Sequence, residues 1–114
     1  MSTDDVVVAK AAIVERALRR VRDAYAGDPT RLTDDVDRQD VIVLNLQRAC
    51  EAVIDLAMHL VRRRALGVPQ ESREAFRMLV AAGEIDAGLG RALQRMVGFR
   101  NVAVHDYTQL DLGI

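Results

Sequence analysis

The sequence predicts an all-α fold, an antiparallel bundle of four to five helices with a long central second helix. Half of the residues are hydrophobic, but only 4% are aromatic and none is tryptophan, so the core must be built from aliphatic side chains. The only prolines, Pro29 and Pro69, fall between segments whose apolar residues recur at helical spacing. A chain of 114 residues suits a single domain, residues 1–114, around one core.

The first helix is expected from about Asp4 to Tyr25. Gly27, Asp28 and Pro29 follow it and are typical of a helix end. Its apolar positions alternate in steps of three and four and form one stripe: Val7, Ala11, Val14, Leu18, Val21 and Tyr25.

The second helix is expected from about Thr33 or Asp34 to Leu66, with Gly67 and Pro69 ending it. It carries two neighbouring apolar stripes, which together are too wide for one partner helix, so it should pack against several. The stripes are Ile42, Leu46, Ala49, Val53, Leu56 and Leu60, and beside them Val43, Cys50, Ile54, Ala57 and Val61.

A third stripe on the same helix is polar. Two interpretations stay open: a solvated face with ion pairs, or one wall of a functional cleft. Its members are Asn45, Arg48, Asp55, His59 and Arg62.

Two shorter patterns follow. Ser72 is a suitable N-cap for a third helix closed by Gly83, and Asp86 is a suitable N-cap for a fourth. The apolar positions are Ala75, Phe76, Leu79 and Val80 in the third helix, and Leu89, Leu93, Met96, Phe99 and Ala103 in the fourth.

The composition excludes several classes of protein. A net charge of -1 excludes gross attraction to nucleic acid, although a local basic cleft remains compatible with it. Lys10 is the only lysine among 16 basic residues. Arginine binds phosphate bidentately, but the codon bias of a GC-rich genome would explain the same excess of arginine.

The single cysteine, Cys50, favours a buried thiol over a disulfide. An acidic N-terminus without a long apolar run predicts a cytoplasmic protein that makes no membrane contact.

Polar side chains suited to catalysis are concentrated at the end of the fourth helix, in the run from Arg100 to Tyr107. Gln94, Gly98, Asn101 and His105 share a helix face. A helical glycine costs about 1 kcal/mol relative to alanine, so something approaches Gly98 closely, either a substrate or, more commonly, another helix.

The spacing of the polar side chains restricts how one helix can present them. Arg100 and His105 are five residues apart, about 140° around an ideal helix, and Tyr107 would point nearly away from His105. If all three serve one site, the helix must end or distort near His105.

These residue types suit cleavage of an RNA phosphodiester. Histidine takes up and releases protons near neutral pH, arginine stabilises charge on phosphate oxygens, and Asn101 can hold the phosphate or orient His105. No HxxxH, CxxC or carboxylate cluster occurs, so neither a metal nor another cofactor is expected. The simpler alternative is that Arg100 and His105 only cap carbonyls at a helix terminus.

One His105 per chain leaves an acid–base pair incomplete. A two-fold dimer would supply a second imidazole across a shared cleft. His59 on the polar stripe is the alternative within one chain. The dimer is favoured.

At these residues the chain resembles the HEPN superfamily, and within it the HepT-type toxins. Their signature is an arginine followed by a polar residue, a histidine four to six positions later, and a tyrosine two beyond it. Arg100, Asn101, His105 and Tyr107 occupy those places. The segment of the second helix from Asn45 to Ala57 is also similar to the family.

The resemblance implies a metal-independent ribonuclease, the toxin of a type VII-like toxin–antitoxin pair. It implies catalysis by Arg100 and His105 with support from Asn101, in a homodimer that binds RNA. It also implies a minimal nucleotidyltransferase antitoxin that transfers AMP to Tyr107. Two alternatives remain: a non-catalytic HEPN-like module that binds a nucleotide or a partner, and a helical protein whose motif only organises a dimer.

Overall fold

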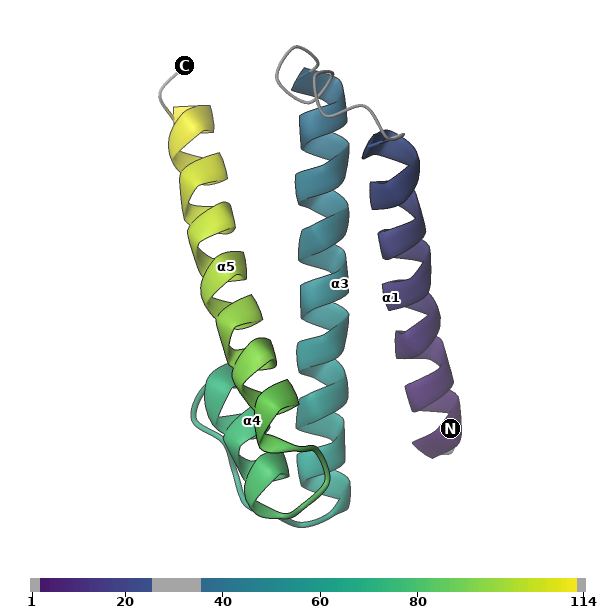
Figure 1. Cartoon of the computed structure of the whole chain (residues 1–114), viewed down its shortest axis with the longest axis vertical. Helices are drawn as coiled ribbons and strands as arrows, with labels where there is room; N and C mark the ends of the chain where they lie inside the picture. Colours follow the sequence, from purple (N-terminus) through teal and green to yellow (C-terminus); the bar gives the residue numbers. More distant parts are fainter. Residues whose placement is uncertain (1–2, 26–35, 113–114) are drawn as a thin grey trace. The chain divides into compact units, whose positions relative to one another are not determined.

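The computed structural model describes residues 3–25 and 36–112, with side chains for residues 5–24 and 36–102. These residues form the helices α1 (Thr3–Tyr25), α3 (Val36–Arg63), α4 (Ser72–Ala81) and α5 (Ala87–Leu112) (Figure 1). The expected all-α fold is confirmed. The chain divides within α3 into two compact units, Met1–Val53 and Ile54–Ile114. No helix in the described ranges combines the length and the apolarity needed to cross a membrane.

In the first unit, α1 runs antiparallel to the beginning of α3 (Figure 1), and Nη1 of Arg38 donates to the carbonyl of Ala24 at 3.4 Å. The expected bounds of α1 are confirmed, but its apolar stripe is only partly right. Ala11 and Leu18 are exposed, whereas Ala17 is buried. The buried or half-buried positions recur from Val7 on in the same alternating steps of three and four, and they are Val6, Val7, Lys10, Val14, Ala17, Val21 and Ala24.

The long helix α3 carries the expected broad apolar surface. Of the second stripe, Val43 is half-buried and all the others are buried: Cys50, Ile54, Ala57 and Val61. The expected start of α3, at Thr33 or Asp34, lies outside the described residues. So does the expected stop of the first helix at Gly27, Asp28 and Pro29.

The predicted end of this helix at Leu66 is wrong, because α3 ends at Arg63. The chain reverses at Ala65, which has a φ of 54° in the left-handed region. The amide of Ala65 donates to the carbonyl of Arg62 at 3.1 Å, and that of Leu66 to the carbonyl of Val61 at 3.0 Å. This pair of bonds is a Schellman motif, in which alanine occupies the position that usually holds glycine.

The short helix α4 has the expected core, since Ala75, Phe76 and Leu79 are buried. Its N-cap is Glu71 and not Ser72, and no side chain caps the first turn. Gly83, with a φ of 76°, closes the helix as predicted.

The start of α5 is the expected one. Oδ1 of Asp86 accepts a 2.7 Å hydrogen bond from the amide of Leu89, which confirms Asp86 as a cap. This helix packs against α4 (Figure 1). Gly90 is buried at the contact, where a Cβ would overlap Cγ2 of Val80, so the small residue allows the two helices to approach.

The predicted apolar stripe of α5 is partly wrong. Leu89 and Phe99 are 46% and 54% exposed, whereas Val97, outside the stripe, is 3% exposed. Among the described side chains of α5, the buried positions are Gly90 and Val97. They are seven residues apart and so share one side of the helix, the side of the contact with α4. The side chain of Ala103 lies outside the described side chains.

The prediction that the helix ends or distorts near His105 is also wrong, because α5 is helical through Leu112. From Phe99 to Leu112 the sequence has neither glycine nor proline, so no residue breaks the helix at that point. The prediction rested on the assumption that one chain brings Arg100, His105 and Tyr107 together, and the backbone contradicts that assumption.

Candidate functional site

The motif arginine lies in the second half of α5, next to Asn101. Arg100 is half-buried and Asn101 is exposed. Nε of Arg100 donates a 3.0 Å hydrogen bond to Oδ1 of Asn101. This bond restrains one edge of the guanidinium and leaves the amide nitrogen of Asn101 available as a donor.

These two residues line a pocket between α4 and α5. Its volume is about 200 Å³. The first residues of α4 form one side and one face of α5 forms the other, and the lining residues are Glu71, Ser72, Arg73, Val97, Arg100 and Asn101. The pocket therefore holds two guanidinium groups from two different helices.

The second guanidinium explains the glycine in the middle of α5. A Cβ on Gly98 would lie 2.8 Å from Nη2 of Arg73, which is too close for that side chain to keep its position. The sequence predicted a close approach at Gly98, by a substrate or by another helix. The approaching group is an arginine side chain from the neighbouring helix α4.

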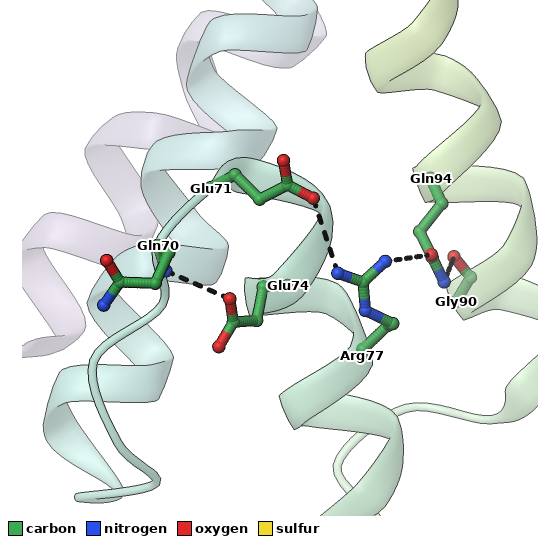
Figure 2. Close-up of polar contacts among 6 residues, drawn as sticks. All are labelled: Gln70, Glu71, Glu74, Arg77, Gly90 and Gln94. Carbon is green, nitrogen blue, oxygen red and sulfur yellow. Dashed lines mark hydrogen bonds and ion pairs between the residues drawn. The ribbon is translucent and has the colours of Figure 1, made fainter.

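A second arginine of α4 ties the two helices together beside the pocket (Figure 2). Nη2 of Arg77 lies 3.4 Å from Oε1 of Glu71, and Nη1 donates to Oε1 of Gln94 at 3.3 Å. Gln94 in turn donates to the carbonyl of Gly90 at 3.3 Å. Gln94, which shares the helix face of Asn101, thus holds α4 against α5.

The side chains of His105 and Tyr107 lie outside the described side chains, but their backbone is part of α5. On an unbroken helix, positions 101 and 105 lie on one side, one turn apart. Positions 100 and 107 share another side, because seven residues are close to two full turns. Arg100 and His105 are then about 140° apart. The side chains of the motif therefore cannot all lie on the same side of one copy of α5.

The polar stripe of α3 does not form one uniform face. Asn45 is only 3% exposed, and its Nδ2 donates to the carbonyl of Val41 at 2.8 Å. Arg48 and Asp55 are exposed. His59 is half-buried, and among the described residues its buried Nε2 has no hydrogen-bond partner. Neither Asp55 nor His59 lines the pocket described above.

Sequence reasoning missed Arg73. Nothing in its neighbourhood distinguishes it from the other arginines, and only the helical glycine at position 98 indicated that a group approaches there. Within the described part of the chain, no cluster of three or more histidine, cysteine or acidic residues could hold a metal ion.

The chain is similar to known proteins along nearly its whole length. A family model for ribonuclease HepT-like proteins matches residues 14–114. The mRNA nuclease HepT of Shewanella oneidensis is 43% identical over 111 residues, which cover 97% of this chain and 83% of that protein.

Two solved structures have the same fold. The tri-AMPylated Shewanella oneidensis HEPN toxin, in complex with the MNT antitoxin, aligns with a TM-score of 0.86 at 43% identity, over 94% of this chain and 78% of that one. A toxin–antitoxin complex with AMP-PNP aligns with a TM-score of 0.86 at 42% identity, over 95% and 83% of the two chains. The resemblance inferred from the Arg100–Tyr107 motif is confirmed, as is the expected enzyme class: the chain belongs to the ribonuclease HepT-like family.

Proposed function

We propose that this protein is the toxin of a toxin–antitoxin pair and cleaves RNA without a metal ion, in a cleft shared by two copies of the chain. Arg100 and His105 are the catalytic residues, and Asn101 supports Arg100. The observation that carries the proposal is Arg100, half-buried and restrained by Asn101, in a pocket that also holds a second arginine. It occurs in a chain of a ribonuclease family.

The reaction needs few groups. A base removes the proton of a ribose 2′-hydroxyl, whose oxygen attacks the adjacent phosphorus. The bond to the 5′ oxygen breaks, and an acid protonates that oxygen, leaving a cyclic phosphate and a free hydroxyl. Imidazoles serve as base and acid near neutral pH. The guanidinium of Arg100 stabilises the charge on the phosphate oxygens.

Three observations support a shared cleft. An unbroken α5 spreads Arg100 and His105 about 140° apart, so a second copy is the simplest source of the missing groups. Phe99 and Val102, which flank Arg100 and Asn101, are 54% and 60% exposed in the single chain, as expected of an apolar interface. His59, the alternative second imidazole, has a buried Nε2 and does not line the pocket that holds Arg100.

The test is cleavage of cellular RNA in EDTA, using protein whose intact mass shows that Tyr107 carries no adduct. Arg100→Ala and His105→Ala should each cleave about 10²–10⁴-fold more slowly, because each removes charge stabilisation or proton transfer. Arg95→Ala removes the same charge from an exposed position on α5 and should cleave like wild type.

Light scattering should show the same dimer for all four proteins. Unmodified wild type that cuts no RNA would refute the nuclease function. RNA binding without cleavage would instead support a non-catalytic module.

The proposed antitoxin is a minimal nucleotidyltransferase that transfers AMP to Tyr107. The solved HEPN toxin that is 43% identical is tri-AMPylated and bound to an MNT antitoxin. On an unbroken α5, position 107 lies two turns along from position 100. Anionic groups attached there would attract Arg100 and repel RNA phosphate.

Co-production with the nucleotidyltransferase should add the mass of one or more AMP groups. Tyr107→Phe should abolish this addition and keep the toxin active. The chain has only one other tyrosine, so Tyr25→Phe is the matched control. An adduct that persists in Tyr107→Phe and disappears in Tyr25→Phe would place the modification on Tyr25 and contradict this mechanism.

A further inference from the structure

We propose that the pocket between α4 and α5 binds a backbone phosphate of the RNA next to the cleaved bond, and that Arg73 is its principal ligand. This inference rests on the proposed ribonuclease function and extends it, since it adds a binding residue from outside the Arg100–Tyr107 motif. The pocket is lined by guanidinium groups from both helices, Arg73 and Arg100, and has a volume of about 200 Å³.

The position of Arg73 depends on Gly98. Nη2 of Arg73 occupies space that a Cβ at position 98 would otherwise fill, one turn before Asn101. The chain thus keeps a helix-weakening glycine where the guanidinium passes α5. Val97, 3% exposed, forms an apolar part of the lining beside it. The Arg73 side chain is exposed and reaches the pocket past Gly98, so its guanidinium is accessible to a ligand.

The hydrogen-bonding capacity of Arg73 is available for a ligand. Within the described part of the chain, the Arg73 side chain has no hydrogen bond or ion pair. Among the described lining residues the acidic one is Glu71, and its Oε1 lies 3.4 Å from Nη2 of Arg77 (Figure 2). The negative charge of Glu71 is therefore partly balanced from outside the pocket, and the described lining carries two arginines against this one carboxylate.

The other lining groups favour phosphate over a nucleobase. Ser72 and the amide nitrogen of Asn101 add hydrogen-bond donors. Among the described side chains no aromatic one belongs to the lining, so these residues offer no surface on which a base would stack. Guanidinium forks and small donors without a stacking surface bind the sugar–phosphate backbone and position the strand without reading its sequence.

The experiment measures binding of a short single-stranded RNA to His105→Ala protein with unmodified Tyr107, so that cleavage does not interfere. Adding Arg73→Ala should weaken binding about tenfold, as expected for the loss of a charge-assisted hydrogen bond. It should also make the slope of log K against log salt shallower by about 0.7 for each phosphate that the protein no longer neutralises. Adding Arg95→Ala is the control, because it removes the same charge from α5 outside the pocket.

A second variant displaces the guanidinium without removing its charge. Gly98→Ala should weaken RNA binding in the same direction as Arg73→Ala, because the new methyl group excludes Nη2 of Arg73. Circular dichroism checks that both variants remain helical. Equal affinities and salt slopes for Arg73→Ala and Arg95→Ala would overturn the proposal.

Three further results separate this proposal from its alternatives. If wild type cleaves RNA but Arg73→Ala binds it unchanged, the subsite is wrong and the ribonuclease function stands. If wild type does not cleave RNA, the function is wrong whatever the binding data show. If Arg73→Ala loses only the transfer of AMP to Tyr107, the pocket serves the phosphate of the adduct, which also contradicts the RNA subsite.

Discussion

At the scale of single residues, two glycines of α5 have opposite roles. Gly90 is buried against the β-branched Val80, whereas Gly98 faces the flexible end of Arg73. Gly90→Ala should lower the free energy of unfolding by about 1–3 kcal/mol, because an added methyl group overpacks the α4–α5 contact. Gly98→Ala should not lower it and should raise it by up to about 1 kcal/mol, since the guanidinium moves aside and alanine favours the helix.

Urea unfolding of the two variants, together with the KM for RNA cleavage, checks this contrast. We expect Gly90→Ala to be less stable, with its KM unchanged in the folded protein. Gly98→Ala should be stable with a raised KM. A destabilised Gly98→Ala with a normal KM would mean that Arg73 only packs there.

Residue-level prediction from sequence succeeded where a local rule applies. Asp86 caps α5 because a carboxylate at that position accepts from the first turn, and Gly98 admits a close neighbour. Arg73 and the link from Arg77 to Gln94 were not predictable, because each depends on how α4 packs against α5.

At the scale of elements, α3 and α4 end in the same way with different residues. Each has the two hydrogen bonds of a Schellman motif, around Ala65 at a φ of 54° in α3 and around Gly83 at a φ of 76° in α4. Ala65→Gly should raise the free energy of unfolding by about 1 kcal/mol, since the left-handed conformation is unfavourable for a residue with a Cβ.

The matched variant is Gly83→Ala. It should lower the free energy of unfolding by a similar amount through conformation alone, because no atom lies within 4 Å of the added Cβ. Chemical unfolding measures both changes. Effects of the same sign for the two substitutions would show that the turns are not equivalent.

The helices themselves were predictable from apolar periodicity, but their ends and faces were less so. The turn that closes α3 is formed by a left-handed alanine, Ala65, which no sequence rule favours over Gly67. Leu18, Leu89 and Phe99 were assigned to the core because they are large and apolar, yet each is at least 37% exposed in the single chain. The continuation of α5 past His105 was missed because the whole motif was assumed to converge within one chain.

At the scale of the whole molecule, composition and periodicity predicted the all-α fold, and the Arg100–Tyr107 motif predicted the family. Net charge did not predict the local site. A chain with a net charge of -1 has two arginines in a pocket of about 200 Å³, because α4 and α5 each contribute one. The sequence favoured a shared cleft because each chain has one motif histidine, His105, and the continuous α5 adds a geometric reason for the same proposal.

The most direct test of the shared cleft is the activity of a heterodimer with one wild-type chain and one His105→Ala chain. The two chains are co-produced with different tags, isolated by sequential affinity steps, and checked by native mass spectrometry after the RNA cleavage assay. If the two imidazoles act across one cleft, the heterodimer should retain about 1% or less of the wild-type rate, because one acid–base group contributes about 10²–10⁴-fold. A heterodimer that retains half of the wild-type rate would contradict the shared cleft, since each chain would then hold a complete site of its own.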